Sequence, residues 1–141
     1  MNKSAIVTGS SSGIGRAIAE RLLADGWQVH GLDVAPAVIA HSAFAAHRVD
    51  LTDARATDIT MDEVLTANAP KALVHAAGVA RLAPPMLQDP ARAATRPRMP
   101  PIGRFIEPRE VAALVAYLLS PDAAAITGQD IAICGGASLQ R

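Results

Sequence analysis

The sequence predicts an α/β fold in which a parallel β-sheet carries helices on both faces. Short apolar runs at 4–8, 27–32 and 71–75 are typical of buried parallel strands, and segments with helical periodicity lie between them. Hydrophobic residues make up 50% of the chain and aromatic residues only 3%, so we expect a core of small aliphatic side chains, as in layered α/β proteins. A length of 141 residues suits one domain, and we expect residues 1–141 to form it.

A glycine-rich turn connects the first strand to the first helix. The strand ends at Thr8, and Gly9, Gly13 and Gly15 follow, where the backbone turns sharply or lets another group approach closely. Apolar residues then recur at helical spacing over 14–22. A helix that begins at the end of a buried strand offers free backbone N–H groups and a partial positive charge, which together suit a pyrophosphate. The pattern favours a dinucleotide-binding turn, with a purely structural tight turn as the alternative.

An acidic residue makes this interpretation more specific. Asp33 ends the next apolar run, about 20 residues beyond the turn, where dinucleotide-binding folds carry the residue that contacts the ribose. A carboxylate there accepts hydrogen bonds from the ribose hydroxyls of NAD and repels the 2′-phosphate of NADP. We therefore predict NAD as the preferred cofactor.

The rest of the chain is predicted from periodicity and from its prolines. In chain order, the expected elements are a loop or short helix at 34–46, a short strand at 47–50, a weak helix at 52–67, a strand at 71–75, a proline-rich loop at 79–101, a helix at 108–119 and a strand at 130–134.

Charge and cysteine content argue against several classes of partner. The chain has 13 basic and 13 acidic residues, so no electrostatic surface for nucleic acid or for an anionic membrane is expected. Cys134 is the single cysteine, and His41 and His47 have no companions at metal-ligand spacing, so we expect neither an internal disulfide nor a metal site. No apolar run approaches the roughly 18 residues of a membrane span. We expect a soluble, cytoplasmic protein.

The spacing of the glycine turn, Thr8-Gly9-x-x-x-Gly13-Ile14-Gly15, resembles that of the short-chain dehydrogenase/reductase family. Asp50-Leu51 is similar to the family's adenine-contacting pair, and 75–78 stands where the family has Asn-Asn-Ala-Gly. The resemblance covers about 3–82 and 84–138. It implies a dinucleotide site formed by Thr8, Gly9, Ser11, Ser12, Gly13, Ile14, Gly15, Asp33, Asp50, Leu51, Ala76, Ala77 and Gly78.

The catalytic residues that the resemblance implies have no match in this chain. The family carries a Tyr and a Lys four residues apart on one helix, with a Ser on the preceding strand and an Asn on an earlier helix. The one tyrosine here is Tyr117, and Pro121 stands four residues on; the lysines are Lys3 and Lys71. We interpret Tyr117 as a core or interface residue and predict no catalytic residue. The chain passes, near 83–84, from the end of the fourth strand to a segment similar to the one that follows the family's sixth strand.

The resemblance also predicts the order of the sheet. Family sheets are ordered 3-2-1-4-5-6-7, so a chain without strands five and six is expected to form about five strands in the order 3-2-1-4-7. The helix at 108–119 would be the right-handed crossover, and 130–134 would pair with 71–75. The expected architecture is a single truncated Rossmann-type domain. Cys134, which stands where the family usually has Asp, is the departure at the last turn.

Three hypotheses about function remain open at this point. The chain is an oxidoreductase that moves hydride to or from NAD(P), a non-catalytic nucleotide-binding or subunit-interaction module that pairs with a full-length paralogue, or a structural remnant. We favour NAD binding without turnover. Relatives associate through the C-terminal helix and last strand, so the resemblance also implies a homo-oligomer through 108–119 and 130–134.

Overall fold

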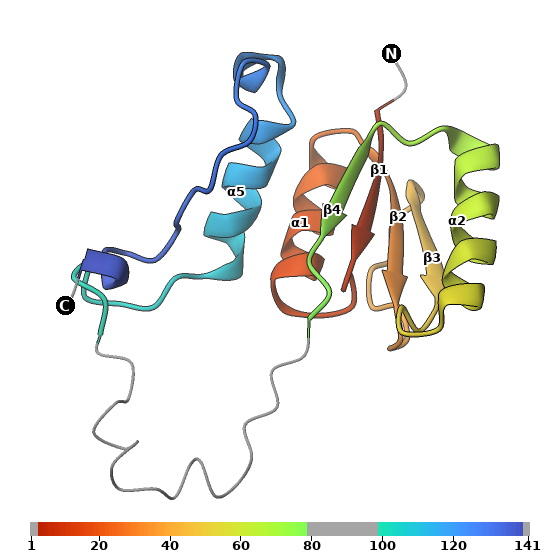
Figure 1. The fold of residues 1–141 in the computed structure, drawn as a ribbon, viewed down its shortest axis with the longest axis horizontal. Helices are drawn as coiled ribbons and strands as arrows, with labels where there is room; N and C mark the ends of the chain where they lie inside the picture. The colour runs from red at the N-terminus through yellow and green to blue at the C-terminus, as the bar shows by residue number, and fades with distance from the viewer. Residues whose placement is uncertain (1–2, 79–98, 140–141) are drawn as a thin grey trace, which may run out of the picture. The chain divides into compact units, whose positions relative to one another are not determined.

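The computed structural model describes residues 3–78 and 99–139 (Figure 1). The chain divides into two compact units, of which the first comprises 1–77 with 108–128 and the second 78–107 with 129–141. The first unit contains the sheet, its covering helices and nearly all of the predicted dinucleotide site.

The sheet has four parallel strands, β1 (Ser4–Thr8), β2 (Gln28–Asp33), β3 (Phe44–Arg48) and β4 (Ala72–His75). Their order is β3-β2-β1-β4, which confirms the α/β class and the predicted order of the first four strands. Thr8 pairs with both Leu32 and His75, so the carboxyl ends of β1, β2 and β4 meet at one edge of the sheet. Ligands bind at this edge in open α/β sheets.

In the described residues, the strands are flanked by the helices α1 (Gly13–Ala24), α2 (Ala54–Asn68) and α5 (Pro108–Leu118). Asp53 caps α2 by accepting a hydrogen bond from the Ala56 N–H, and the helix ends at Ala69, which has a left-handed φ of 41°. Short 3₁₀ turns follow at Pro121–Ala123 and Ala137–Leu139. In the described part of the chain, no helix is long and apolar enough to cross a bilayer.

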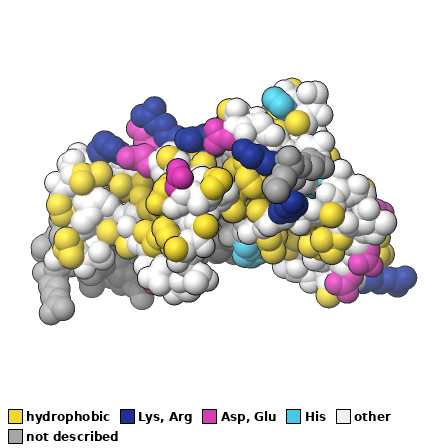
Figure 2. All heavy atoms as spheres, turned by 90° about the horizontal axis from the view of Figure 1, so that it is seen from above, with side chains coloured by type: hydrophobic (Ala, Val, Ile, Leu, Met, Phe, Trp, Pro, Cys, Tyr) yellow, Lys and Arg dark blue, Asp and Glu magenta, His cyan; other side chains and the backbone are white. Residues whose placement is uncertain are grey.

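The alternation of β1 divides the core between the two faces of the sheet. Ala5 and Val7 pack with α1 and with Ala112 of α5, whereas Ile6 packs with Leu32, Val49 and Val64 on the α2 face. Both faces are therefore covered by helices, as the sequence predicts. Figure 2 shows acidic and basic side chains intermingled with hydrophobic ones on the face that it presents.

The prediction of a fifth strand at 130–134 is wrong. Residues 130–134 form no strand, and their segment belongs to the second unit, where the Ile102 N–H donates to the Gly135 carbonyl at 3.2 Å. Helix α5 also differs from its predicted role. The connection from β3 to β4 runs through α2 and crosses the sheet towards its β4 edge. A connection from β4 to a further strand would cross in the same direction, so a right-handed crossover needs its helix on the α2 face as well. Because α5 packs on the α1 face, it is not the predicted crossover.

The third strand also differs from its prediction. It spans Phe44–Arg48 rather than 47–50, and 49–50 lie just beyond its end. Val29 pairs with Phe44 and Asp33 with Arg48, so the strand begins where β2 can first offer it hydrogen-bond partners. The Val49 N–H still donates to the Asp33 carbonyl at 2.9 Å, which continues the ladder by one bond.

Candidate functional site

The turn between β1 and α1 depends on glycine at three positions. Gly9 and Gly13 have φ values of 71° and 53°, in the left-handed region that favours glycine. A Cβ atom on Gly9 would lie 2.9 Å from the Ala77 Cα, and one on Gly15 would overlap the Gly9 carbonyl. The first turn of α1 therefore packs directly on the end of β1. Apart from its chain neighbours and its own helix, no described atom lies within 4 Å of the Cβ position of Gly13, so the backbone there is open to an approaching group.

The start of α1 keeps its backbone donors available. Ser12 is the N-cap residue, but its side chain makes no capping hydrogen bond, and the first turn has no acidic residue. The first helical bond runs from the Arg16 N–H to the Ser12 carbonyl at 3.1 Å. The N–H groups of Gly13, Ile14 and Gly15 precede that bond, so no intrahelical carbonyl accepts from them. Such a helix start suits a phosphate.

Asp33, at the end of β2, lies against this turn. Its Oδ2 accepts a hydrogen bond from the Ser11 N–H at 2.9 Å, and its Oδ1 accepts one from the Ala35 N–H at 2.9 Å. Partial burial alone would raise the pKa of Asp33, but the hydrogen bonds from Ala35 and Ser11 outweigh it and hold the pKa below its ordinary value. The carboxylate is therefore ionised at neutral pH and has a defined orientation beside the glycine turn.

Thr8 connects the ends of β1 and β4. Its Oγ1 accepts hydrogen bonds from the N–H groups of Ala76 and Ala77, at 3.1 and 3.0 Å, and lies 3.0 Å from His75 Nδ1. Two donors occupy both lone pairs of the hydroxyl, so its proton points to Nδ1, and His75 carries its own hydrogen on Nε2. This contact holds the small residues 76–77 beneath the glycine turn.

Asp50 and Leu51, the pair predicted to contact adenine, lie in different surroundings. Asp50 follows β3 and is exposed. Its carboxylate accepts hydrogen bonds from the Thr52 hydroxyl and the Thr52 N–H, and these bonds, the hydroxyl's being the stronger influence, hold the pKa of Asp50 below its ordinary value. Leu51 packs instead against the core on the α2 face. In 3–78 and 99–139 the hydrogen bonds of the Asp50 carboxylate go to Thr52 and not to the glycine turn, so the structure brings Asp33 and Thr8 to the turn but not Asp50. Gly78, the last predicted residue of the site, has no described atom other than those of its chain neighbours within 4 Å of its Cβ position.

The sequence did not indicate a role for two residues that shape the site, Ser10 and Gly31. Ser10 is only 3% exposed, and a Cβ on Gly31 would lie 2.5 Å from its hydroxyl and collide with the ring of Phe44. Gly31 therefore lets the turn settle against β2. A glycine in the middle of a strand is the signal that would have indicated such a close approach.

Tyr117, the single tyrosine, lies on α5 with its side chain 47% exposed. Its carbonyl accepts hydrogen bonds from the Ser120 hydroxyl and N–H, and Pro121 stands four residues further along the chain. Within 3–78 and 99–139 no three His, Cys, Asp or Glu side chains are grouped to hold a metal ion.

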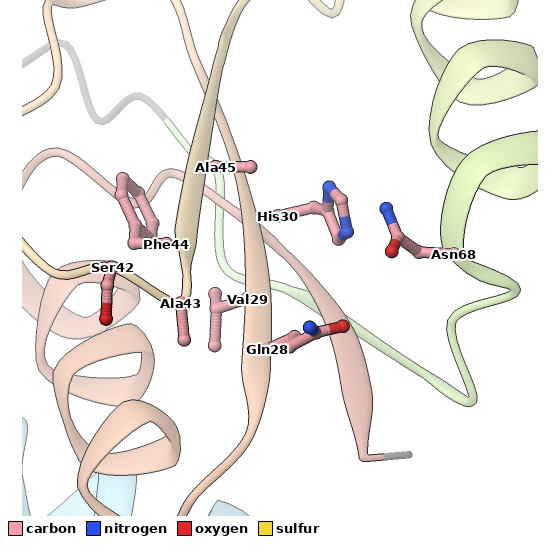
Figure 3. Close-up of a pocket in the computed structure, with 8 residues that line it drawn as sticks. All are labelled: Gln28, Val29, His30, Ser42, Ala43, Phe44, Ala45 and Asn68. Atoms are coloured by element: carbon pink, nitrogen blue, oxygen red, sulfur yellow. The ribbon is translucent and has the colours of Figure 1, made fainter.

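A small pocket lies away from this turn, at the amino-terminal end of β2 (Figure 3). It has a volume of about 140 Å³, and Figure 3 shows the side chains of His30 and Asn68 facing one another across it. His30 Nδ1 lies 3.1 Å from His47 Nε2 on β3. The pocket contains none of the predicted dinucleotide-binding residues.

Two family models match the chain. The model of the NAD dependent epimerase/dehydratase family matches residues 5–95, which is more than half of the chain. The model described as enoyl-(acyl carrier protein) reductase matches residues 83–138. The first match contains the glycine turn and Asp33, and the second contains α5.

Curated relatives with substantial identity are reductases. A tropinone reductase homologue of Arabidopsis thaliana is 49% identical over 55 residues, which are 39% of this chain and 21% of that protein. A 3-oxoacyl-[acyl-carrier-protein] reductase of Vibrio cholerae is 48% identical over 50 residues, which are 36% of this chain and 20% of that protein. The matched part thus spans about a fifth of the length of these relatives.

Solved structures share the fold. The ligand-free aldohexose dehydrogenase of Thermoplasma acidophilum superposes with a TM-score of 0.83 at 20% identity, covering 99% of this chain and 95% of that one. A short chain dehydrogenase of Leptospira borgpetersenii with bound NAD⁺ gives a TM-score of 0.81 at 16% identity, covering 98% and 93%. The family-model match, the reductase relatives and this common fold agree with the glycine turn and its Asp33. The chain belongs to the short-chain dehydrogenase/reductase family.

Proposed function

We propose that this chain binds NAD, in preference to NADP, at the turn between β1 and α1, and that it does not transfer hydride on its own. The observation that carries the proposal is the pair of hydrogen bonds that hold the Asp33 carboxylate beside the glycine turn. The family implies a nicotinamide dinucleotide, and the residues present fit one. The open backbone at Gly13 and the uncapped start of α1 suit the pyrophosphate.

Cofactor preference follows from the charge and hydrogen-bonding capacity of Asp33. Each carboxylate oxygen accepts one backbone N–H, which leaves a lone pair on each oxygen for a ribose hydroxyl. The same negative charge repels the additional phosphate of NADP. Ser11, Ser12, Ile14 and Gly15 would surround the pyrophosphate, and Asp50, Leu51 and 76–78 would border the adenosine.

The nicotinamide ring supplies a hydride donor or acceptor when the cofactor is bound, but this chain offers little to use it. A positioned acid or base contributes about 10² to 10⁴ in rate, and the sequence has no Tyr–Lys pair to supply it. The family's segments that would border the nicotinamide have no match in this chain, so we also expect weak binding, with a Kd in the micromolar to millimolar range, or about −8 to −4 kcal/mol.

Calorimetry with NAD⁺ and NADP⁺ tests the preference. We expect tighter binding of NAD⁺, and Asp33→Ala should reduce or reverse the difference because it removes the negative charge. Asp25→Ala is the matched control, since Asp25 is an exposed carboxylate that pairs with Arg21 on α1. Equal or tighter binding of NADP⁺ by the unmodified chain refutes the preference, and binding of neither cofactor favours a structural remnant.

A turnover assay tests the second half of the proposal. The purified chain should oxidise NADH no faster than background across a panel of ketones and aldehydes, because each copy lacks the same acid–base residues. Tyr117→Phe is the informative variant if turnover is seen. Activity that this variant abolishes would make Tyr117 a catalytic residue, and activity that survives it would assign catalysis to other side chains.

The family's mode of association gives one candidate route to a homo-oligomer. Of the two elements that this route would use, only the helix α5 is formed, because 130–134 is not a strand. Tyr117 is half-exposed on that helix, so Tyr117→Glu should weaken any association through α5. We place this chain in the cytoplasm, where a single free cysteine such as Cys134 stays reduced.

A further inference from the structure

The outer edge of β4 has hydrogen-bonding groups directed away from the sheet. The Gln28 N–H donates to the Lys3 carbonyl and the Gly9 N–H donates to the Leu32 carbonyl, so the odd-numbered residues of β1 face β2. The even-numbered residues of β1 then face β4. Ile6 is paired with Leu73 and bonds to the residues on either side of it, Ala72 and Val74. Leu73 and His75 therefore direct their N–H and C=O groups outward.

Nothing in the described part of the chain pairs with this edge, and β4 is the last strand of the sheet. Exposed edges are normally protected by a proline, a charged side chain or a bulge. Residues 72–75 contain no proline and no Lys, Arg, Asp or Glu. Leu73 is 62% exposed, although it stands on a strand whose other apolar residues are half-buried. The edge therefore has the properties of a strand-pairing surface.

We propose that β4 pairs with β4 of a second copy of this chain, antiparallel and about a two-fold axis, so that the two sheets become continuous. In one register Leu73 lies opposite His75 of the second copy, and His75 lies opposite Leu73 of the second copy. This register uses the two outward N–H groups and the two outward C=O groups of each strand, which gives four hydrogen bonds in total. It needs no residue beyond β4.

Side chains support the same register. Val74 lies on the axis, opposite Val74 of the second copy, as a non-hydrogen-bonded pair, in which side chains come closest. On the α2 face the exposed Leu73 side chain packs against the imidazole of the second copy's His75. Lys71 is the nearest charged residue in sequence, and in this register it lies opposite Ala77 of the second copy, so no like charges meet. With a net charge of zero, two copies also approach without long-range repulsion.

The chemistry of the edge favours a second copy over an unrelated partner. An isologous interface requires a surface that complements itself, and equal numbers of outward donors and acceptors on β4 meet that requirement. A different protein would need an exposed edge of its own, and nothing on β4 selects for one. The contact is short, so association should be weak and depend strongly on concentration.

Sedimentation equilibrium of the full chain measures this association. The weight-average mass should rise from 14.6 kDa towards twice that value as concentration increases. Leu73→Lys should raise the dimer dissociation constant by about tenfold or more, because it puts a charge at the seam. Leu65→Lys is the matched control, since Leu65 is a half-exposed leucine on α2, and it should change the constant by less than about twofold.

A cross-linking experiment tests the register. In a Cys134→Ser background, Val74→Cys should form a disulfide-linked dimer under mild oxidation, because non-hydrogen-bonded partners lie about 4.5 Å apart at Cα, within disulfide range. Leu73→Cys should cross-link far less, since it faces His75 of the second copy. A monomer at all concentrations overturns the proposal. So does a dimer that is insensitive to Leu73→Lys but lost in Tyr117→Glu, which would place the contact on α5.

Discussion

Thr8 is the residue at which the sheet and the candidate site depend most directly on one side chain. It is 5% exposed and its hydroxyl takes part in three contacts, with the N–H groups of Ala76 and Ala77 and with His75 Nδ1. The backbone at 76–77 no longer continues the ladder with β1, so this hydroxyl stands in for the strand carbonyl that would otherwise accept.

Replacing Thr8 by valine should therefore destabilise the protein although the shape of the side chain is kept. The change leaves two backbone donors and one imidazole nitrogen without their partner, at about 1–3 kcal/mol for a buried unsatisfied group. We expect the free energy of unfolding in urea to fall by about 2 kcal/mol. Thr8→Ser keeps the hydroxyl and should cost less than about 1 kcal/mol. Equal losses in the two variants would show that the methyl group, not the hydrogen bonds, matters.

At the scale of the element, helix propensity and packing have opposite effects on a substitution of Gly15 at the start of α1. Gly15 lies inside the helix, where alanine is favoured by about 1 kcal/mol. A Cβ there would overlap the Gly9 carbonyl and lie 3.0 Å from the Thr8 carbonyl, and both of these atoms are backbone. Overpacking of this kind costs about 1–3 kcal/mol even in side-chain cores, where neighbours can move. The clash should therefore outweigh the propensity.

Gly15→Ala should accordingly lower the free energy of unfolding by about 2 kcal/mol and weaken NAD binding, because α1 must move away from β1. Gly78→Ala is the control for stability, as no described atom beyond its chain neighbours lies within 4 Å of its Cβ position and its φ is not in the left-handed region. It should stay within about 0.5 kcal/mol of the unmodified chain. Denaturation in urea, followed by far-UV circular dichroism, measures both. A stabilised Gly15→Ala would contradict the close packing of turn and helix.

Elements with local signals were predicted well, and those that depend on distant packing were not. Helix α1 and strands β1 and β2 follow from periodicity and glycine punctuation, and they form within a residue or two of their expected bounds. The apolar residues at 131–133 gave an equally good local signal for a last strand. Whether such a segment becomes a strand depends on hydrogen-bond partners that are distant in sequence, which no local pattern contains. Helix α5 packs on the α1 face, and 130–134 is not a strand.

At the scale of the whole molecule, the candidate site shows the same limit. The glycine turn and Asp33 could be predicted, because the spacing of a strand–turn–helix unit is local and the carboxyl ends of neighbouring parallel strands meet. The contact between Thr8 and His75 joins residues 67 positions apart, and it exists only because β1 and β4 pair in this register. The role of Gly31 likewise depends on Ser10 and Phe44, which tertiary packing brings to it.

The pH dependence of stability should be controlled by the histidine pair that joins β2 to the edge strand β3. His30 is 6% exposed and its Nδ1 lies 3.1 Å from His47 Nε2, within hydrogen-bond distance. Burial, and then the charge of His47, lower the pKa of His30 below its ordinary value. Pocket residues Gln28 and Asn68 face the ring without adding a charge. Protonation of His30 is therefore opposed in the folded state.

A histidine whose pKa is lowered by folding binds protons more tightly when the chain is unfolded. The free energy of unfolding should thus be flat above about pH 7 and fall as the pH drops through about 6.5, the ordinary histidine value, towards the lowered pKa of His30. The lowered pKa of Asp33 acts in the same direction in a separate window, below about pH 3.9. Urea denaturation between about pH 5 and 8 measures the first window. His30→Gln keeps a hydrogen-bonding partner for His47 and should flatten the slope, whereas His41→Gln, on an exposed loop, should leave it unchanged. Stability that rises as the pH falls from 7 to 5, or an equal flattening in both variants, would show that the buried pair does not control this titration.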